Sequence, residues 1–73
     1  MNESDFLLLI ADELMISAEA ITLDTPFRTI PTWTSLNALL VVSRLHEETG
    51  CMISANEIAN SSQLKDLFHL IVE

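Results

Sequence analysis

Ser35 is the residue whose type and place in the sequence best suit a covalent chemistry. It stands in the stretch Trp33-Thr34-Ser35-Leu36, where Thr34 is a suitable helix N-cap and Ser35 begins the first turn. A side chain at that position points outward, beside unpaired backbone N–H groups and the positive end of the helix dipole. This environment suits an attached phosphodiester. The same residues are compatible with an ordinary helix start, in which Ser35 only shares the capping with Thr34.

Catalytic and metal-binding chemistry find little support elsewhere in the chain. His46 and His69 are the only histidines and do not have the spacing of a metal site, so we expect both on helix surfaces. A single glycine excludes a glycine-rich phosphate loop, and Cys51 is more typical of a small apolar residue than of a reactive thiol. No base is placed beside Ser35, which disfavours a small serine hydrolase. We therefore expect no catalytic residue and no metal site.

Neighbouring carboxylates are the remaining candidates for acid–base chemistry. Asp12 is followed by Glu13, and Glu47 by Glu48. Adjacent residues on a helix point in different directions, so these pairs do not converge on a common substrate. We expect them to lie on solvated helix faces.

Length and composition exclude several other classes of protein. The chain has 73 residues, a hydrophobic content of 49% and a formal net charge of −8. These values fit one small domain spanning residues 1–73, and they disfavour a disordered tail or a nucleic-acid-binding protein. One cysteine cannot form an internal disulfide, the N-terminus is acidic, and no apolar run approaches the roughly twenty residues that a bilayer requires. We expect a soluble cytoplasmic monomer without nucleic-acid or membrane partners.

Apolar periodicity and capping residues predict an all-α fold. We expect helices at about residues 4–15, 35–49, 54–60 and 62–72. The expected caps, in chain order, are Ser4, Thr34 with Gly50 at the end of the second helix, a capping box at Ser54 and Glu57, and one of Asn60, Ser61 or Ser62. The result is a small bundle of three main helices plus one short helix. Since residues 35–49 are apolar on more than one face, we expect that helix to be central.

The predicted loop over residues 15–34 is long for so small a domain. We expect it to be ordered and pinned to the bundle by its apolar side chains. These are Ile21, Leu23, Phe27, Ile30 and Trp33.

Several short stretches occur in an order and at intervals that are typical of one family. They are residues 21–27 (ITLDTPF), 30–36 (IPTWTSL), 47–54 (EETGCMIS) and 64–67 (LKDL), with eight residues from Phe27 to Ser35. Together they cover nearly the whole chain, and the chain resembles the acyl carrier protein family. In that family a serine in an Asp-Ser-Leu motif, at the start of the second helix, carries 4′-phosphopantetheine.

The resemblance implies a non-catalytic carrier modified at Ser35, with Thr34 and Leu36 flanking the attachment site. A phosphopantetheinyl transferase would attach the arm from coenzyme A, and the arm's thiol would hold acyl or aminoacyl groups as thioesters. Further partners would be acyl-transfer, ketosynthase or acyl-ligase type enzymes. An acyl chain would be sheltered between helices, although each candidate residue also fits ordinary core packing. The pocket candidates are Leu36, Leu39, Leu40, Ile53 and Ile58.

Two departures from the family pattern bear on function. Thr34 replaces the aspartate of the motif, which keeps the N-cap but loses a negative charge. The helix at 35–49 has no acidic residue before Glu47, whereas carriers of fatty-acid synthesis usually place several acids there. These departures point to a specialised lipid or secondary-metabolite pathway. They also leave open an alternative, a carrier-like helical module that is never modified and acts by binding proteins.

Overall fold

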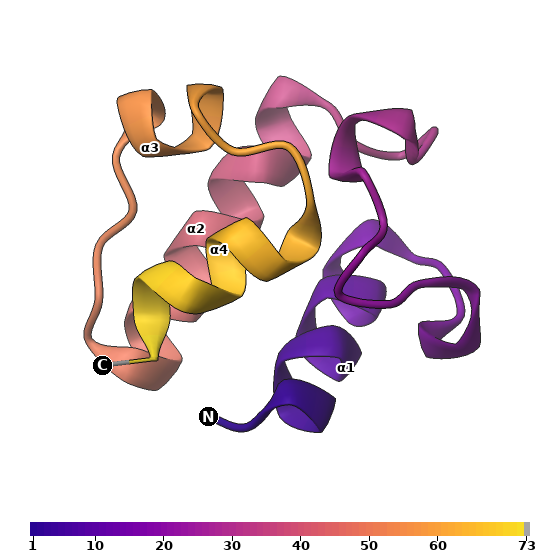
Figure 1. Cartoon of the computed structure of the whole chain (residues 1–73), viewed down its shortest axis with the longest axis horizontal. Coiled ribbons are helices and arrows are strands. Elements are labelled where there is room, and N and C mark those ends of the chain that lie inside the picture. Colours follow the sequence, from indigo (N-terminus) through magenta and orange to yellow (C-terminus); the bar gives the residue numbers. More distant parts are fainter. Residues whose placement is uncertain (73) are drawn as a thin grey trace.

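Four α-helices make up the computed structural model, which describes residues 1–72 (Figure 1). They are α1 (Glu3–Leu14), α2 (Ser35–Thr49), α3 (Ala55–Ala59) and α4 (Leu64–Ile71). Two 3-10 turns, η1 (Ala18–Ala20) and η2 (Phe27–Thr29), lie in the connection between α1 and α2. No strand occurs in the described part, so the all-α prediction is confirmed. Glu73, the last residue of the predicted domain, lies outside the described residues.

The start and end of α2 agree with the sequence prediction. The Thr34 hydroxyl accepts a hydrogen bond from the backbone N–H of Asn37 at 3.1 Å, and Gly50 ends the helix in the left-handed region with φ of 77°. The capping box before α3 is also confirmed, because the side chains of Ser54 and Glu57 each accept the other residue's backbone N–H. The polar residues at these positions therefore fix the bounds of both helices.

Two predicted helix caps are wrong. Asn2, not Ser4, caps α1, and its Oδ1 accepts the N–H of Asp5 at 2.7 Å. Gln63, and not one of the three residues before it, is the N-cap of α4, with φ of −115° and ψ of 159°. In both cases the N-cap is the residue with extended backbone immediately before the first helical turn. Residue type alone does not predict which of several polar residues takes that position.

The core is formed mainly by α1, α4 and the long loop. Its buried members are Phe6, Leu9, Ile10, Ala11, Leu14, Ile21, Phe27, Ile30, Val41, Leu45, Ile53, Leu64, Leu67 and Ile71. From α2 only Val41 and Leu45 are buried, and Ala38 and Val42 are half-buried. The helix packs against α1, but Leu36, Leu39 and Leu40 stay exposed, so fewer of its apolar side chains are covered than the sequence predicts.

The loop over residues 15–34 is ordered, as predicted. Phe27 is fully buried, Ile21 and Ile30 are buried, and Leu23 and Trp33 pack against the core. The rings of Phe27 and Trp33 lie 4.6 Å apart, centroid to centroid, and are tilted by 50°. These contacts hold the segment immediately before Ser35 against the bundle.

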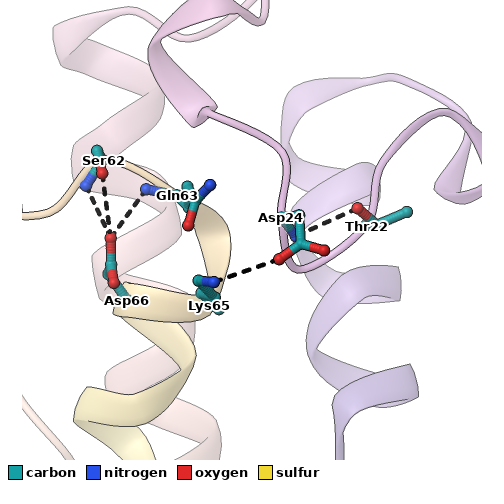
Figure 2. A network of polar contacts seen from close by, with 6 residues as sticks. All are labelled: Thr22, Asp24, Ser62, Gln63, Lys65 and Asp66. Atoms are coloured by element: carbon teal, nitrogen blue, oxygen red, sulfur yellow. Dashed lines mark hydrogen bonds and ion pairs between the residues drawn. The ribbon is translucent and has the colours of Figure 1, made fainter.

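Backbone hydrogen bonds dock the same loop onto the start of α4. The N–H groups of Leu64 and Lys65 donate to the carbonyls of Thr25 and Leu23, at 3.0 and 2.8 Å. Figure 2 shows the side chains at this junction, where the ammonium of Lys65 lies 3.4 Å from a carboxylate oxygen of Asp24. Carbonyls of a distant segment thus pair the first two backbone N–H groups of α4.

The Asp66 carboxylate completes this junction. It accepts the backbone N–H groups of Gln63 and Ser62, at 3.0 and 2.9 Å, and these hydrogen bonds lower the pKa of Asp66 below its ordinary value of 3.8 (Figure 2).

Asp66 is therefore expected to stabilise the fold only in its ionised form. A lowered folded-state pKa contributes stability above the ordinary value of 3.8, and this contribution is lost as the pH falls through the folded-state pKa. Replacing Asp66 by Asn should lower the urea midpoint at neutral pH and bring variant and wild type together in strong acid. An equal difference between the two proteins at both pH values would contradict this role.

Candidate functional site

The first turn of α2 presents Ser35 to solvent. Thr34 makes the cap hydrogen bond, and its carbonyl accepts the N–H of Ala38 at 2.8 Å. Capping therefore does not need the Ser35 hydroxyl. At the start of a helix the N–H groups of Ser35 and Leu36 have no intrahelical partner, and they adjoin the place where a phosphate on Ser35 would lie.

The loop before Ser35 is braced onto the same turn. The amide Nδ2 of Asn37 donates to the Thr32 carbonyl at 2.7 Å, across the two residues that separate Thr32 from Ser35. Trp33 lies between them, and its ring packs on Phe27. The position of the hydroxyl is thus set by the core through Phe27, by the cap through Thr34 and by this brace.

An apolar cavity of about 350 Å³ lies beside Ser35, between α2, α3 and the segment joining them. Its lining is Ser35, Ala38, Leu39, Val42, Ile53, Ala55 and Ile58. Apart from the Ser35 hydroxyl, every side chain in this lining is apolar. The attachment candidate and an apolar hollow therefore share one site.

The sequence-predicted pocket residues divide into two groups. Leu39, Ile53 and Ile58 line the cavity, whereas Leu36 and Leu40 do not. That Leu36 and Leu40 shelter an acyl chain stays a prediction, and in the structure both side chains lie outside this cavity. Residues 35, 38, 39 and 42 form a stripe with the spacing i, i+3, i+4 and i+7, and Leu36 and Leu40 lie off it.

That same spacing was the signal for the lining residues that the sequence analysis missed. Ala38 and Val42 belong to the stripe through Ser35, and Ala55 follows the cap of the short helix α3. Their small or branched side chains gave no chemical signal of their own. Only the helical register relates them to Ser35.

An exposed apolar face adjoins Ser35 on α2. Leu36 and Leu39 are 66% and 68% exposed, and Leu40 is 42% exposed. The first turn of α2 has no acidic residue, and Glu47 and Glu48 lie in its exposed last turn. The surface beside the attachment candidate is therefore uncharged.

The arginine of α2 is paired. Arg44 Nη1 lies 2.7 Å from Asp12 Oδ2 and 3.0 Å from Glu13 Oε2, and the hydrogen bonds with Glu13 and Asp12 raise the pKa of Arg44. The Asp12 side chain is 75% exposed, as predicted, but that of Glu13 is only 18% exposed, because the guanidinium reaches both carboxylates across the α1–α2 contact. The charge of Arg44 is thus largely compensated.

Other kinds of site are not found in the described part of the chain. Residues 1–72 contain no group of three or more His, Cys, Asp or Glu side chains placed to hold a metal ion. They also contain no helix that is long and apolar enough to cross a membrane. A larger open hollow of about 620 Å³ lies between α1 and the last part of α2, lined by residues that include Asp5, Leu8 and Glu48, and it does not include Ser35.

Comparison with known proteins agrees with this geometry. Residues 4–71 match the family model described as the phosphopantetheine attachment site, which covers both the fold and the segment around Ser35. No curated protein matches the chain. Because the family match extends over almost all of its length, the chain belongs to the phosphopantetheine attachment site family, whose domains carry 4′-phosphopantetheine covalently.

Proposed function

We propose that this protein is a non-catalytic acyl or aminoacyl carrier and that Ser35 is its attachment residue. The single observation that carries the proposal is the position of Ser35, which is exposed at the first turn of α2 and at the edge of an apolar cavity. Among residues 1–72, no other hydroxyl combines these features with the segment that resembles the carrier motif.

The residues around Ser35 would each have a defined part in this function. The Ser35 hydroxyl oxygen would form a bond to the pantetheine-bearing phosphorus of coenzyme A as a transferase breaks the P–O bond of the pyrophosphate. Adenosine 3′,5′-bisphosphate would leave, and the hydroxyl proton would pass to a base of the transferase. The N–H groups of Ser35 and Leu36 and the positive end of α2 would stabilise the negative charge of the phosphodiester. The chemistry that the arm would supply is a thiol that holds an acyl group as a thioester at high effective concentration for successive enzymes.

The cavity would shelter an apolar acyl group. Leu39, Ile53 and Ile58 offer apolar surface, and removing an acyl chain from water is favourable by roughly 0.8 kcal/mol for each methylene buried. The small side chain of Ala38 leaves room beside Ser35. We infer a specialised lipid or secondary-metabolite pathway, because Thr34 replaces the aspartate of the motif and the first turn of α2 has no acidic residue.

Attachment can be tested directly by intact mass. The protein is incubated with coenzyme A and a promiscuous phosphopantetheinyl transferase, and a gain of one phosphopantetheine is expected. An unchanged mass, with a control carrier fully converted in the same reaction, would exclude the carrier function for this chain.

Replacing Thr34 by Asp is expected to speed this modification. Aspartate also caps a helix, so the fold is kept, and it adds a negative charge beside the hydroxyl that can help the transferase hold its metal and substrate. A gain of about 1.4 kcal/mol in the transition state would give a tenfold faster reaction. The Thr34→Ser variant keeps the cap without the charge and should react at the wild-type rate. Equal rates of modification for Thr34→Asp and wild type would show that a negative charge at position 34 does not assist the transferase.

Partner enzymes are proposed to dock mainly on the apolar face of Leu36, Leu39 and Leu40. Since this face is uncharged and Arg44 is paired, the affinity for the transferase should depend only weakly on salt. The dissociation constant is measured over a range of salt concentrations for wild type and for a Glu47→Gln, Glu48→Gln variant. A steep salt dependence that disappears in this variant would instead place docking on the acidic last turn.

An unmodified binding module is the second candidate. Thr34, in place of the family's aspartate, and the exposed leucines are the observations that favour it. Such a module would bind the same partners through α2 without ever carrying a thioester. It predicts no mass gain in the transferase reaction, whereas the carrier predicts one.

A further inference from the structure

Helix α3 is a loosely held wall of the cavity. It has five residues, none of them buried, yet Ala55 and Ile58 contribute to the cavity lining. Its capping box joins Ser54 to Glu57 within the same segment and so does not attach α3 to the rest of the bundle. Apart from the half-buried Ile58 side chain, which packs against the core, a contact from outside the segment is needed to set the distance of α3 from α2.

Arg28, in the long loop, makes that attachment. Its Nη2 donates to the carbonyl of Ile58 at 2.7 Å, and its Nη1 donates to the carbonyl of Ser61. Among residues 1–72, the other hydrogen bonds of residues 55–59 stay within the segment 54–61. The carbonyl of Ile58 is thus held by Arg28 while its side chain lines the cavity.

The guanidinium is itself fixed by the core. Its central carbon lies 4.7 Å from the centroid of the fully buried Phe27 ring, a cation–π geometry that limits where the side chain can lie. The Ile58 carbonyl is in the last turn of α3 and the Ser61 carbonyl lies just beyond its end, where the helix dipole favours a positive charge. The contact therefore joins a rigid anchor to a weakly packed helix.

We propose that Arg28 is a positioning residue that holds α3 against the bundle and thereby sets the width of the cavity beside Ser35. This proposal rests on the proposed carrier function in one respect, because it takes the cavity to be the place where the acyl group is sheltered. With Arg28 bonded, α3 stays close to α2. When the two hydrogen bonds break, α3 moves outward and the cavity accepts a larger group.

Amide hydrogen exchange on the unmodified protein tests the first part. In Arg28→Met, which keeps an apolar stem, the amides of Ile58, Asn60 and Ser61 should exchange at least about tenfold faster than in wild type. The matched control is Lys65→Met, which removes the ion pair of the same loop with α4 but leaves α3 untouched. Amides of α1 and α2 should change no more in Arg28→Met than in this control.

Arg28→Lys gives a second variant that keeps the charge. Lysine lacks the planar fork that reaches both carbonyls, so the exchange rates at α3 should lie between those of wild type and Arg28→Met. Unchanged exchange at α3 in Arg28→Met overturns the proposal. Faster exchange spread equally over all helices also overturns it, since that result reports a merely structural role.

Thiol labelling tests the cavity. In a Cys51→Ala background, Ala38→Cys places the only thiol of the chain in the cavity lining, and Arg28→Met should speed its reaction with a bulky thiol reagent at least about threefold. An unchanged labelling rate alongside faster exchange at α3 overturns the link to cavity width. Both measurements use protein with unmodified Ser35, so their results do not depend on the carrier function. That function is tested separately by the intact-mass measurement.

Discussion

Replacing Ser35 by Ala should abolish the gain of one phosphopantetheine in the transferase reaction. Alanine has no oxygen to bond to phosphorus, so we expect complete loss and not a slower reaction. Ser35 is exposed and Thr34 makes the cap hydrogen bond, so the variant should fold as wild type does. Its free energy of unfolding should differ from that of wild type by at most about 0.5 kcal/mol. The measurement is intact mass after reaction, with circular dichroism as the check of folding.

Ser43→Ala is the matched control for this variant. Ser43 is also an exposed serine of α2, but it does not line the cavity and lies two turns from the start of the helix. Its variant should gain phosphopantetheine as wild type does. Modification of Ser35→Ala, or its loss in Ser43→Ala with the fold intact, would show that the attachment residue is misassigned.

Replacing Phe27 by Ala should unfold much of the protein. Phe27 is fully buried, and it supports both the Trp33 ring and the Arg28 guanidinium. Truncation of a buried phenylalanine costs about 3–5 kcal/mol. A domain of this size has a free energy of unfolding of roughly 0.05–0.15 kcal/mol per residue, so the loss is comparable with its total stability.

Urea unfolding followed by circular dichroism measures this cost. The single tryptophan, Trp33, provides a second probe, because its fluorescence reports on the loop that lies against Phe27. Phe27→Leu keeps most of the buried volume and should cost less than about 1.5 kcal/mol. If Phe27→Ala has the same urea midpoint as wild type, the loop does not depend on this anchor.

The helices could be predicted largely from sequence because their first and last residues depend on neighbouring capping side chains. Thr34, Gly50 and the pair Ser54 and Glu57 act on their own helix ends, so their types and spacing were sufficient. The caps of α1 and α4 could not be predicted in this way. Both segments contain several competing cap residues, and the choice at α4 depends on backbone contacts with the distant loop.

Those parts of the candidate site that depend on a sequence motif or on helical spacing could be predicted. Those that depend on contacts between distant segments could not. The place of Ser35 at a helix start was predictable, and so was the apolar surface of Leu39 beside it. That Leu36 and Leu40 lie outside the cavity was not predictable, because apolar type does not reveal which helix face a neighbour covers. The hydrogen bond of Arg28 with Ile58 of α3 joins residues thirty positions apart, and a short sequence pattern cannot predict such a contact.

Fragmentation of the modified protein by mass spectrometry tests whether Ser35 carries the phosphopantetheine. Cleavage after Arg28 and Arg44 releases the peptide of residues 29–44, which contains Ser35 together with Thr29, Thr32, Thr34 and Ser43. We expect phosphopantetheine on this peptide, and fragments on either side of Ser35 should assign it to that residue. Phosphopantetheine on any other residue, or none on a chain exposed to an active transferase, would contradict this assignment.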